Sequence, residues 1–166
     1  IMYPTVGLSI YRIQDNTLVM ALFRAYNDWL SEFCGAFPDR LLGIGCVILD
    51  DVAVAVQELE RCAKMGLVGA MIPVAPPLDQ PYHKPEYEPL WAAAQDLAMP
   101  LSLHIATNRP GVGQKFAQID SMRPAFISNV DHWVRMSLAD IIFSGAFERY
   151  PKLQVGSVEM ELSWVP

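Results

Sequence analysis

The residues best suited to metal binding or catalysis are a few histidines and carboxylates, and His104 is the first of them. It ends the apolar segment Leu101-Ser102-Leu103, and the polar residues Thr107, Asn108 and Arg109 follow it closely. A neutral imidazole at the end of a buried strand is a common metal ligand, because the strand fixes the direction of the ring. The same position also suits a core histidine whose ring nitrogens are satisfied by neighbours, so both interpretations stay open at this point.

Two carboxylates close the last apolar segment, "VGSVEMEL". Alternation along a strand would point Glu159 and Glu161 to one side and Met160 to the other. A carboxylate at the carboxyl end of a strand could bind a metal ion or act as a general base. A solvated charge, or a cap for a following helix, explains the same residues equally well.

The other histidines and a pair of aspartates favour simpler roles. His83 lies beside Tyr82 in a proline-rich loop, where an exposed residue that helps to cover a site is expected. His132 stands at a helix start, which indicates packing or capping. Asp50 and Asp51 precede a helix and are explained as an N-cap and a first-turn charge that the helix dipole favours.

Composition and absent motifs exclude several classes of protein. The chain is 52% hydrophobic and 18% charged, as a domain with a real core requires, and its net charge of −6 disfavours nucleic acid as a partner. No uninterrupted apolar run is long enough to predict a membrane span, and the sequence does not open with the basic and then apolar segments expected of a secretion signal. GxSxG, HExxH, GxGxxG and the Walker motif do not occur. The cysteines are odd in number and lack CxxC spacing, and Cys46 and Cys62 lie in apolar patterns, which suits core thiols in a reducing cytoplasm.

Strands and helices are expected to alternate along the chain. The patterns predict strands at 2–6, 41–49, 67–74, 100–106 and 151–160, and helices at 15–34, 52–65, 88–99 and 131–150. In the first helix the predicted apolar face consists of Leu18, Leu22, Ala25, Trp29 and Phe33. Between the third strand and the third helix, residues 76–89 hold five of the 13 prolines and must form a loop.

This order predicts an α/β fold with a parallel sheet in a single domain, residues 1–166. Either an open doubly wound sheet or part of a (β/α)₈ barrel fits, and five strands are too few to close a barrel. In both architectures the functional site lies at the carboxyl ends of the strands, which is where His104 and Glu159 are expected.

Three phrases resemble the amidohydrolase-related family, in the branch that includes aminocarboxymuconate-semialdehyde decarboxylase. They are "RAYNDWLSEFCGAFPDRLLGIG", "YEPLWAAAQDLAMPLSLHIAT" and "IIFSGAFERYPKLQV". The resemblance covers nearly the whole chain. It implies a metal-dependent (β/α)₈ TIM barrel, of which this chain supplies roughly strands two to six and is incomplete at both ends.

The resemblance also implies a chemistry. The family holds a divalent metal, expected to be zinc, and His104 matches its strand-five histidine ligand. Glu159 falls where the family often has a strand-six histidine, which implies a catalytic base or a secondary ligand. The candidates for binding substrate are Asn108 and Arg109, which follow His104, and Tyr82 in the proline-rich loop. The implied reaction is hydrolysis or non-oxidative decarboxylation of a small molecule in the cytoplasm, without nucleic acid or membrane, and a homo-oligomer stays open.

Two rival hypotheses remain at this stage. The HxH pair and the final aspartate of the family's metal site have no match in this chain, so a non-catalytic barrel remnant, with a binding or structural role, is the alternative. A metal-free barrel enzyme that forms a Schiff base would need a lysine at a strand end, and none is placed there.

Overall fold

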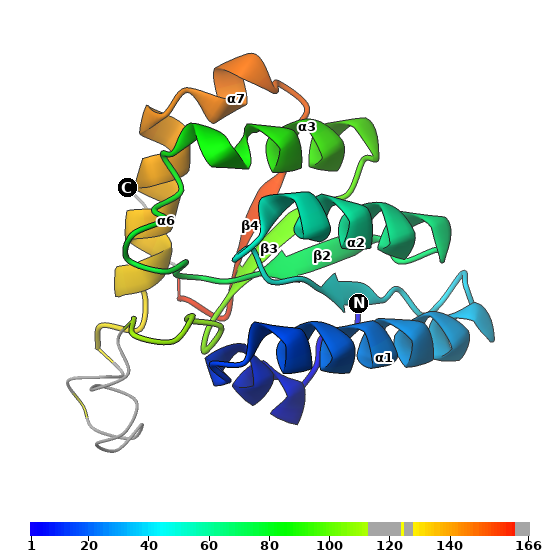
Figure 1. Cartoon of the computed structure of the whole chain (residues 1–166). Helices are drawn as coiled ribbons and strands as arrows, with labels where there is room; N and C mark the ends of the chain where they lie inside the picture. The colour runs from blue at the N-terminus through cyan, green and yellow to red at the C-terminus, as the bar shows by residue number, and fades with distance from the viewer. Residues whose placement is uncertain (113–123, 125–127, 162–166) are drawn as a thin grey trace.

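Four parallel strands form the centre of the fold in the computed structural model, which describes residues 1–112, 124 and 128–161. The strands lie side by side in chain order: β1 (Ile44–Cys46), β2 (Gly69–Ile72), β3 (Leu101–His104) and β4 (Val155–Val158). Figure 1 shows them running through the middle of the molecule. Parallel neighbours need a crossover connection, which confirms the predicted α/β class.

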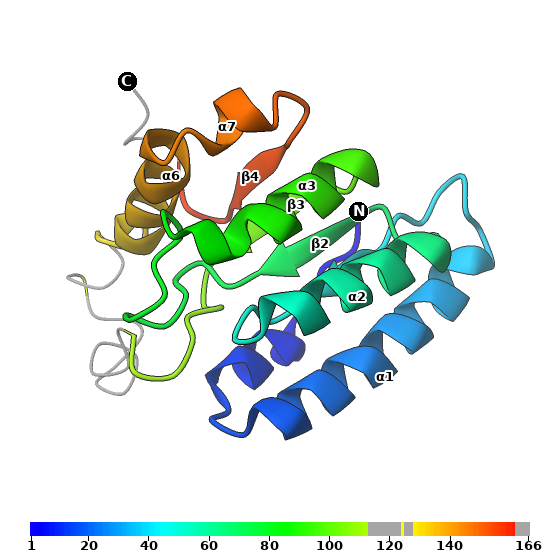
Figure 2. The same cartoon turned by 45° about the horizontal axis from the view of Figure 1, so that its top comes forward.

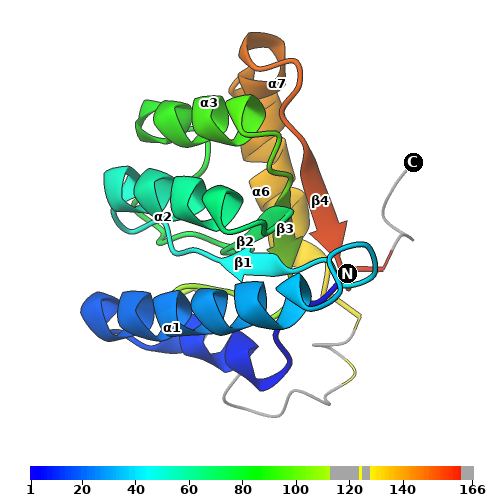
Figure 3. The ribbon, with the colours of Figure 1, turned by 90° about the vertical axis from the view of Figure 1, so that its right-hand side faces the viewer.

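Helices provide these crossovers. They are α1 (Asn16–Gly35), α2 (Val52–Lys64), α3 (Glu88–Asp96), α6 (His132–Phe143) and the short α7 (Ala146–Arg149), with 3₁₀ helices η1 (Val6–Arg12) and η2 (Pro85–Tyr87). Figures 2 and 3 show α1, α2 and α3 stacked in chain order, like the strands they connect. Gly145, with a φ of 77°, separates α6 from α7. Among the described residues, no helix combines the length and the apolar character that crossing a membrane requires.

The register of the sheet decides which residues share a face. Met71 of β2 pairs with Ser102 of β3, and Ser102 pairs with Gly156 of β4, so these three residues point to the same side. His104 lies two residues beyond Ser102 and therefore shares this face. Leu101 and Leu103 point to the opposite side, into the main core that α2, α3 and α6 cover. The sheet thus separates the face covered by α2, α3 and α6 from the face that carries His104, where Met71 packs with residues of η1 and α1.

The first predicted strand is only partly correct. Met2 makes an isolated parallel bridge to Gly43, with hydrogen bonds to Leu42 and Ile44, but Val6 already begins η1. Pro4 explains the early end of pairing, because it has no N–H to donate to the neighbouring strand.

The predicted apolar face of α1 is wrong by about one residue position around the helix. The side chains that face the core are Val19, Phe23, Asn27, Leu30 and Cys34, whereas Leu18, Leu22, Trp29 and Phe33 are 37–50% exposed. Both rows are largely apolar, so the helix has a wider apolar surface than the sheet covers, and periodicity alone could not choose between them.

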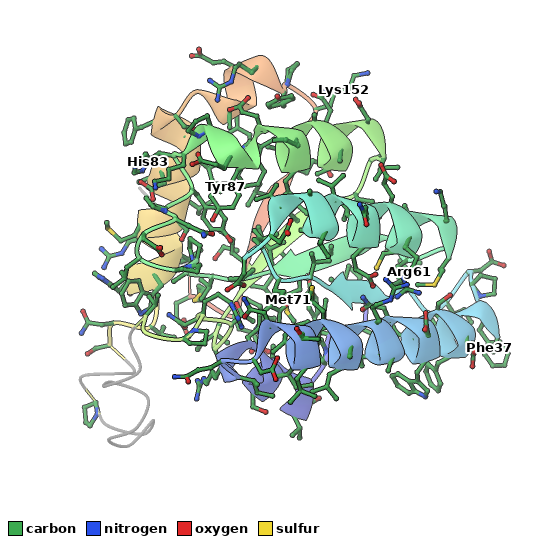
Figure 4. All side chains as sticks on the ribbon, viewed as in Figure 1. Phe37, Arg61, Met71, His83, Tyr87 and Lys152 are labelled. Atoms are coloured by element: carbon green, nitrogen blue, oxygen red, sulfur yellow. The ribbon has the colours of Figure 1, made fainter. Side chains whose placement is uncertain are left out.

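The charged side of α1 packs against α2. Arg61 of α2 bonds to Asp28 of α1 and to Glu58 of its own helix, and Figure 4 shows Arg61 between the two helices. Arg24 of α1 lies 3.8 Å from Glu58. This side chain network fixes the helix pair at the edge of the molecule.

Asn27 joins α1 to the backbone of β1. It is fully buried; its Oδ1 accepts from the Cys46 amide at 2.8 Å, and its Nδ2 donates to the Cys46 carbonyl at 3.0 Å and to Glu58 at 2.8 Å. The side-chain amide therefore occupies the hydrogen-bonding edge of β1 beyond the point where the Met2 bridge ends.

We expect Asn27→Ala to lower the free energy of unfolding by about 2–4 kcal/mol, because it leaves the N–H and C=O of Cys46 buried without partners. Urea unfolding of the full-length protein measures this, with Gln57→Ala on the exposed side of α2 as the control. Equal stabilities of the two variants would show that the Asn27 contacts add nothing.

Candidate active site

His104 lies at the carboxyl end of β3 with its ring 3% exposed. Its Nδ1 is 2.9 Å from the carbonyl oxygen of Ile105, which can only accept a hydrogen bond. Nδ1 therefore carries the hydrogen, and the lone pair lies on Nε2. This is the arrangement that a histidine needs in order to bind a metal ion through Nε2.

Glu159 follows the carboxyl end of the neighbouring strand β4. Its Oε2 lies 3.6 Å from Nε2 of His104, which is close but beyond a hydrogen bond, and its side chain is 67% exposed. Glu159 and Glu161 both have a positive φ, near 58°, so the chain turns sharply here, and Met160 between them is buried. The structure thus brings the two residues singled out in the sequence to one edge of the sheet.

Tyr3 and Ser102 lie next to His104 on the same face of the sheet. The sequence patterns did not single them out. The Tyr3 hydroxyl lies 2.8 Å from Oγ of Ser102, and its ring centroid is 5.3 Å from that of His104. Tyr3 follows the Met2 bridge and Ser102 precedes His104 by two residues. Only the alternation along β3 could have pointed to Ser102, and Tyr3 depends on a contact across 99 residues.

Asn108 carries a buried donor without a partner. Its Nδ2 is buried and makes no hydrogen bond in the structure. Because an unpaired buried amide is costly, such a group is suited to meet an acceptor on a ligand. Binding of substrate by Asn108 stays a prediction, and this geometry is compatible with it.

Arg109 is 1% exposed and ties several loops together. Its guanidinium bonds to both oxygens of Asp50, with Nε at 2.8 Å, and also to Asn16 and to the carbonyls of Tyr11 and Ile13. Each of its five N–H groups thereby has an acceptor within the chain. Binding of substrate by Arg109 stays a prediction, and in this structure its donors are occupied.

The roles expected of Asp50 and Asp51, an N-cap and a first-turn charge, are therefore only partly correct. Asp51 caps α2, with its side chain accepting from the Val54 amide, and Asp50 instead pairs with Arg109. This pairing between residues 59 positions apart leaves no local signal in the sequence.

Tyr82 is fully buried, and its hydroxyl donates to the carbonyl of Pro73 at 2.6 Å. Its ring packs on Tyr87 and Trp91, and burial raises its pKa well above the ordinary value. The structure gives Tyr82 a packing role. Substrate binding by Tyr82 stays a prediction. In the same loop, exposed His83 pairs with Asp140 of α6 at 3.1 Å, and Figure 4 shows His83 and Tyr87 on this side of the molecule.

Cys46 and Cys62 are core residues, as expected. Cys34, Cys46 and Cys62 are all free and buried. Burial raises the pKa of the Cys62 thiol to about 12 and that of Cys46 higher still, which excludes these two as nucleophiles near neutral pH.

The described residues place two possible metal donors near each other. His104 offers Nε2, and Glu159 offers a carboxylate 3.6 Å away. Within the described part of the chain, no three histidine, cysteine or carboxylate side chains converge closely enough to hold an ion. A pocket of about 260 Å³ lined by Asp50, Val52, Gln80, Lys84, Glu86 and Tyr87 lies elsewhere and includes neither residue. The donor chemistry of His104 therefore fits a metal ion, with further ligands needed from other residues.

The amidohydrolase family model matches residues 4–164. A gamma-resorcylate decarboxylase from Rhizobium radiobacter is 34% identical over 104 residues, covering 58% of this chain and 31% of that protein. Another from Rhizobium sp. (strain MTP-10005) is 27% identical over 158 residues, covering 89% of this chain and 46% of that protein.

Solved structures share the fold. The 2,6-dihydroxybenzoate decarboxylase from Rhizobium superposes with a TM-score of 0.71 at 26% identity, covering 90% of this chain and 48% of that one. A 5-carboxyvanillate decarboxylase from Novosphingobium aromaticivorans, with bound manganese, gives 0.70 at 25%, covering 90% and 42%. The chain thus spans about half the length, or less, of these relatives. Its parallel sheet and crossover helices are part of a (β/α)₈ barrel, and the chain belongs to the amidohydrolase family.

Proposed function

We propose that the whole protein is a metal-dependent carboxy-lyase that removes CO₂ from a small aromatic carboxylate without an oxidant. The observation that carries the proposal is that the Glu159 carboxylate lies 3.6 Å from Nε2 of His104 at the carboxyl edge of the sheet, while Nδ1 of His104 faces the Ile105 carbonyl. The similarity to gamma-resorcylate and 5-carboxyvanillate decarboxylases supports the choice of substrate. Metal-dependent hydrolysis of an amide or ester is the second reaction that this donor set would serve.

A divalent cation is the proposed cofactor, with His104 as one ligand through Nε2. Zinc suits an imidazole and carboxylate donor set, and related decarboxylases have been solved with manganese, so both ions are tested below. Bound there, the cation would polarise the carboxylate or a neighbouring oxygen of the substrate.

The chain's own residues would bind the substrate and move a proton. Asn108 offers its unpaired Nδ2–H to a substrate oxygen. In decarboxylation the bond from the ring carbon to the carboxylate breaks, CO₂ leaves, and that ring carbon gains a proton. We assign this transfer to Glu159, which would take up a proton from solvent and pass it to the ring carbon, because its carboxylate is exposed at the site beside His104.

We also propose that the enzyme acts in the cytoplasm, without nucleic acid or membrane as a partner. A net charge of −6 argues against nucleic acid as a partner, and the described residues include no helix fit to cross a membrane. Three free cysteines, all buried, suit the cytoplasm.

The proposal is tested by incubating the purified full-length protein with 2,6-dihydroxybenzoate and with 5-carboxyvanillate, after loading with zinc or manganese. We expect CO₂ release and one phenolic product, both abolished by a chelator and restored by the active metal. Turnover of amide or ester substrates alone would assign hydrolysis instead, and a metal-loaded protein inert toward both classes would contradict an enzymatic role.

A further inference from the structure

A tight turn follows His104 and determines what its ring can do. Ala106 adopts a φ of 68°, in the left-handed region that alanine disfavours. The turn brings the Ile105 carbonyl to 2.9 Å from Nδ1 of His104. A strained residue next to a candidate ligand needs a contact that holds it in place.

The Thr107 hydroxyl is that contact. Thr107 is fully buried, and its Oγ1 donates to the His104 carbonyl at 2.7 Å, which closes the turn. The same oxygen accepts from the Val74 amide at 2.7 Å and so anchors the turn to the segment after β2. A hydroxyl has one hydrogen to donate, and the contact to the Ile72 carbonyl is longer, at 3.4 Å, so the bond to His104 takes the hydrogen.

We infer that Thr107 is a positioning residue for His104. By closing the turn, its hydroxyl holds the Ile105 carbonyl against Nδ1, and this fixes both the tautomer and the orientation of the imidazole. The lone pair is thereby kept on Nε2, toward Glu159. The inference rests on the proposed function, because orientation of this ring matters only if Nε2 binds an ion.

Thr107→Val tests the inference, since it keeps the shape of the side chain and removes the hydroxyl. In the full-length protein we expect the affinity for zinc or manganese to fall on the order of 10-fold or more, as for other groups that orient a metal-binding histidine. In the metal-free protein, nitrogen NMR of His104 should show a single Nδ1–H tautomer in the wild type and a mixture in Thr107→Val. Thr107→Ser restores the hydroxyl and should restore both properties.

Ser137→Ala is the matched control. Ser137 is also buried and donates to the Val74 carbonyl at 2.6 Å, so its loss weakens the same segment without touching the turn. It should lower the melting temperature and leave the tautomer and metal affinity unchanged. The inference is overturned if Thr107→Val behaves like Ser137→Ala. If Thr107→Val does not fold, Thr107→Ala takes its place. If the wild-type protein binds no metal, the proposed function is refuted, but the NMR measurement of the His104 tautomer still tests the inference.

Discussion

His104→Ala in the full-length protein is expected to abolish metal-dependent decarboxylation, with a loss of about 10³-fold or more. A metal ion supplies several kcal/mol of transition-state stabilisation, and the loss of one ligand from a site that needs about three leaves the ion weakly held. Metal content after dialysis, measured by mass spectrometry together with CO₂ release, reports both effects.

His132→Ala is the control for this variant. His132 begins α6, is exposed, and packs edge-on against Trp133 with 4.8 Å between the ring centroids. It should retain metal and activity. Full metal content in a folded His104→Ala protein would return His104 to the core and remove it from the active site.

Arg109→Met is expected to destabilise the protein by about 3–5 kcal/mol. The variant leaves the Asp50 carboxylate and the carbonyls of Tyr11 and Ile13 without their donor, and breaking one side of a buried ion pair costs about this much. Urea or thermal unfolding of the full-length protein measures the loss.

Arg149→Met is the matched control, since Arg149 pairs with Glu88 on the surface, with 46% and 30% of the side chains exposed. A pair of this kind contributes about 0–1 kcal/mol. The double variant Arg109→Met with Asp50→Leu should recover part of the stability, because it removes both buried charges. If Arg109→Met and Arg149→Met lower the free energy of unfolding equally, the buried pair of Arg109 and Asp50 is not needed for stability.

The elements of the barrel could be predicted from sequence because their signals are local. Continuous apolar runs marked β1 to β3, where every strand residue is buried, and Asp51 marked the start of α2. The position of His104 at the end of β3 followed from the same local pattern.

The rest of the site depends on contacts between distant segments. Asp50 pairs with Arg109, Tyr3 contacts Ser102, and the Thr107 hydroxyl meets Val74, and each pair lies more than 30 positions apart. No periodicity or spacing rule encodes such contacts. The buried face of α1 was also mistaken, because two adjacent apolar rows compete and only the packed sheet selects one.

The most direct test of the central claim is a crystal structure of the full-length protein loaded with zinc or manganese, with data collected at the absorption edge of the metal. The account predicts an anomalous peak about 2.0–2.2 Å from Nε2 of His104, near the carboxylate of Glu159. A metal bound elsewhere, with Nε2 of His104 still free of any ion, would contradict the assignment of this edge as the active site.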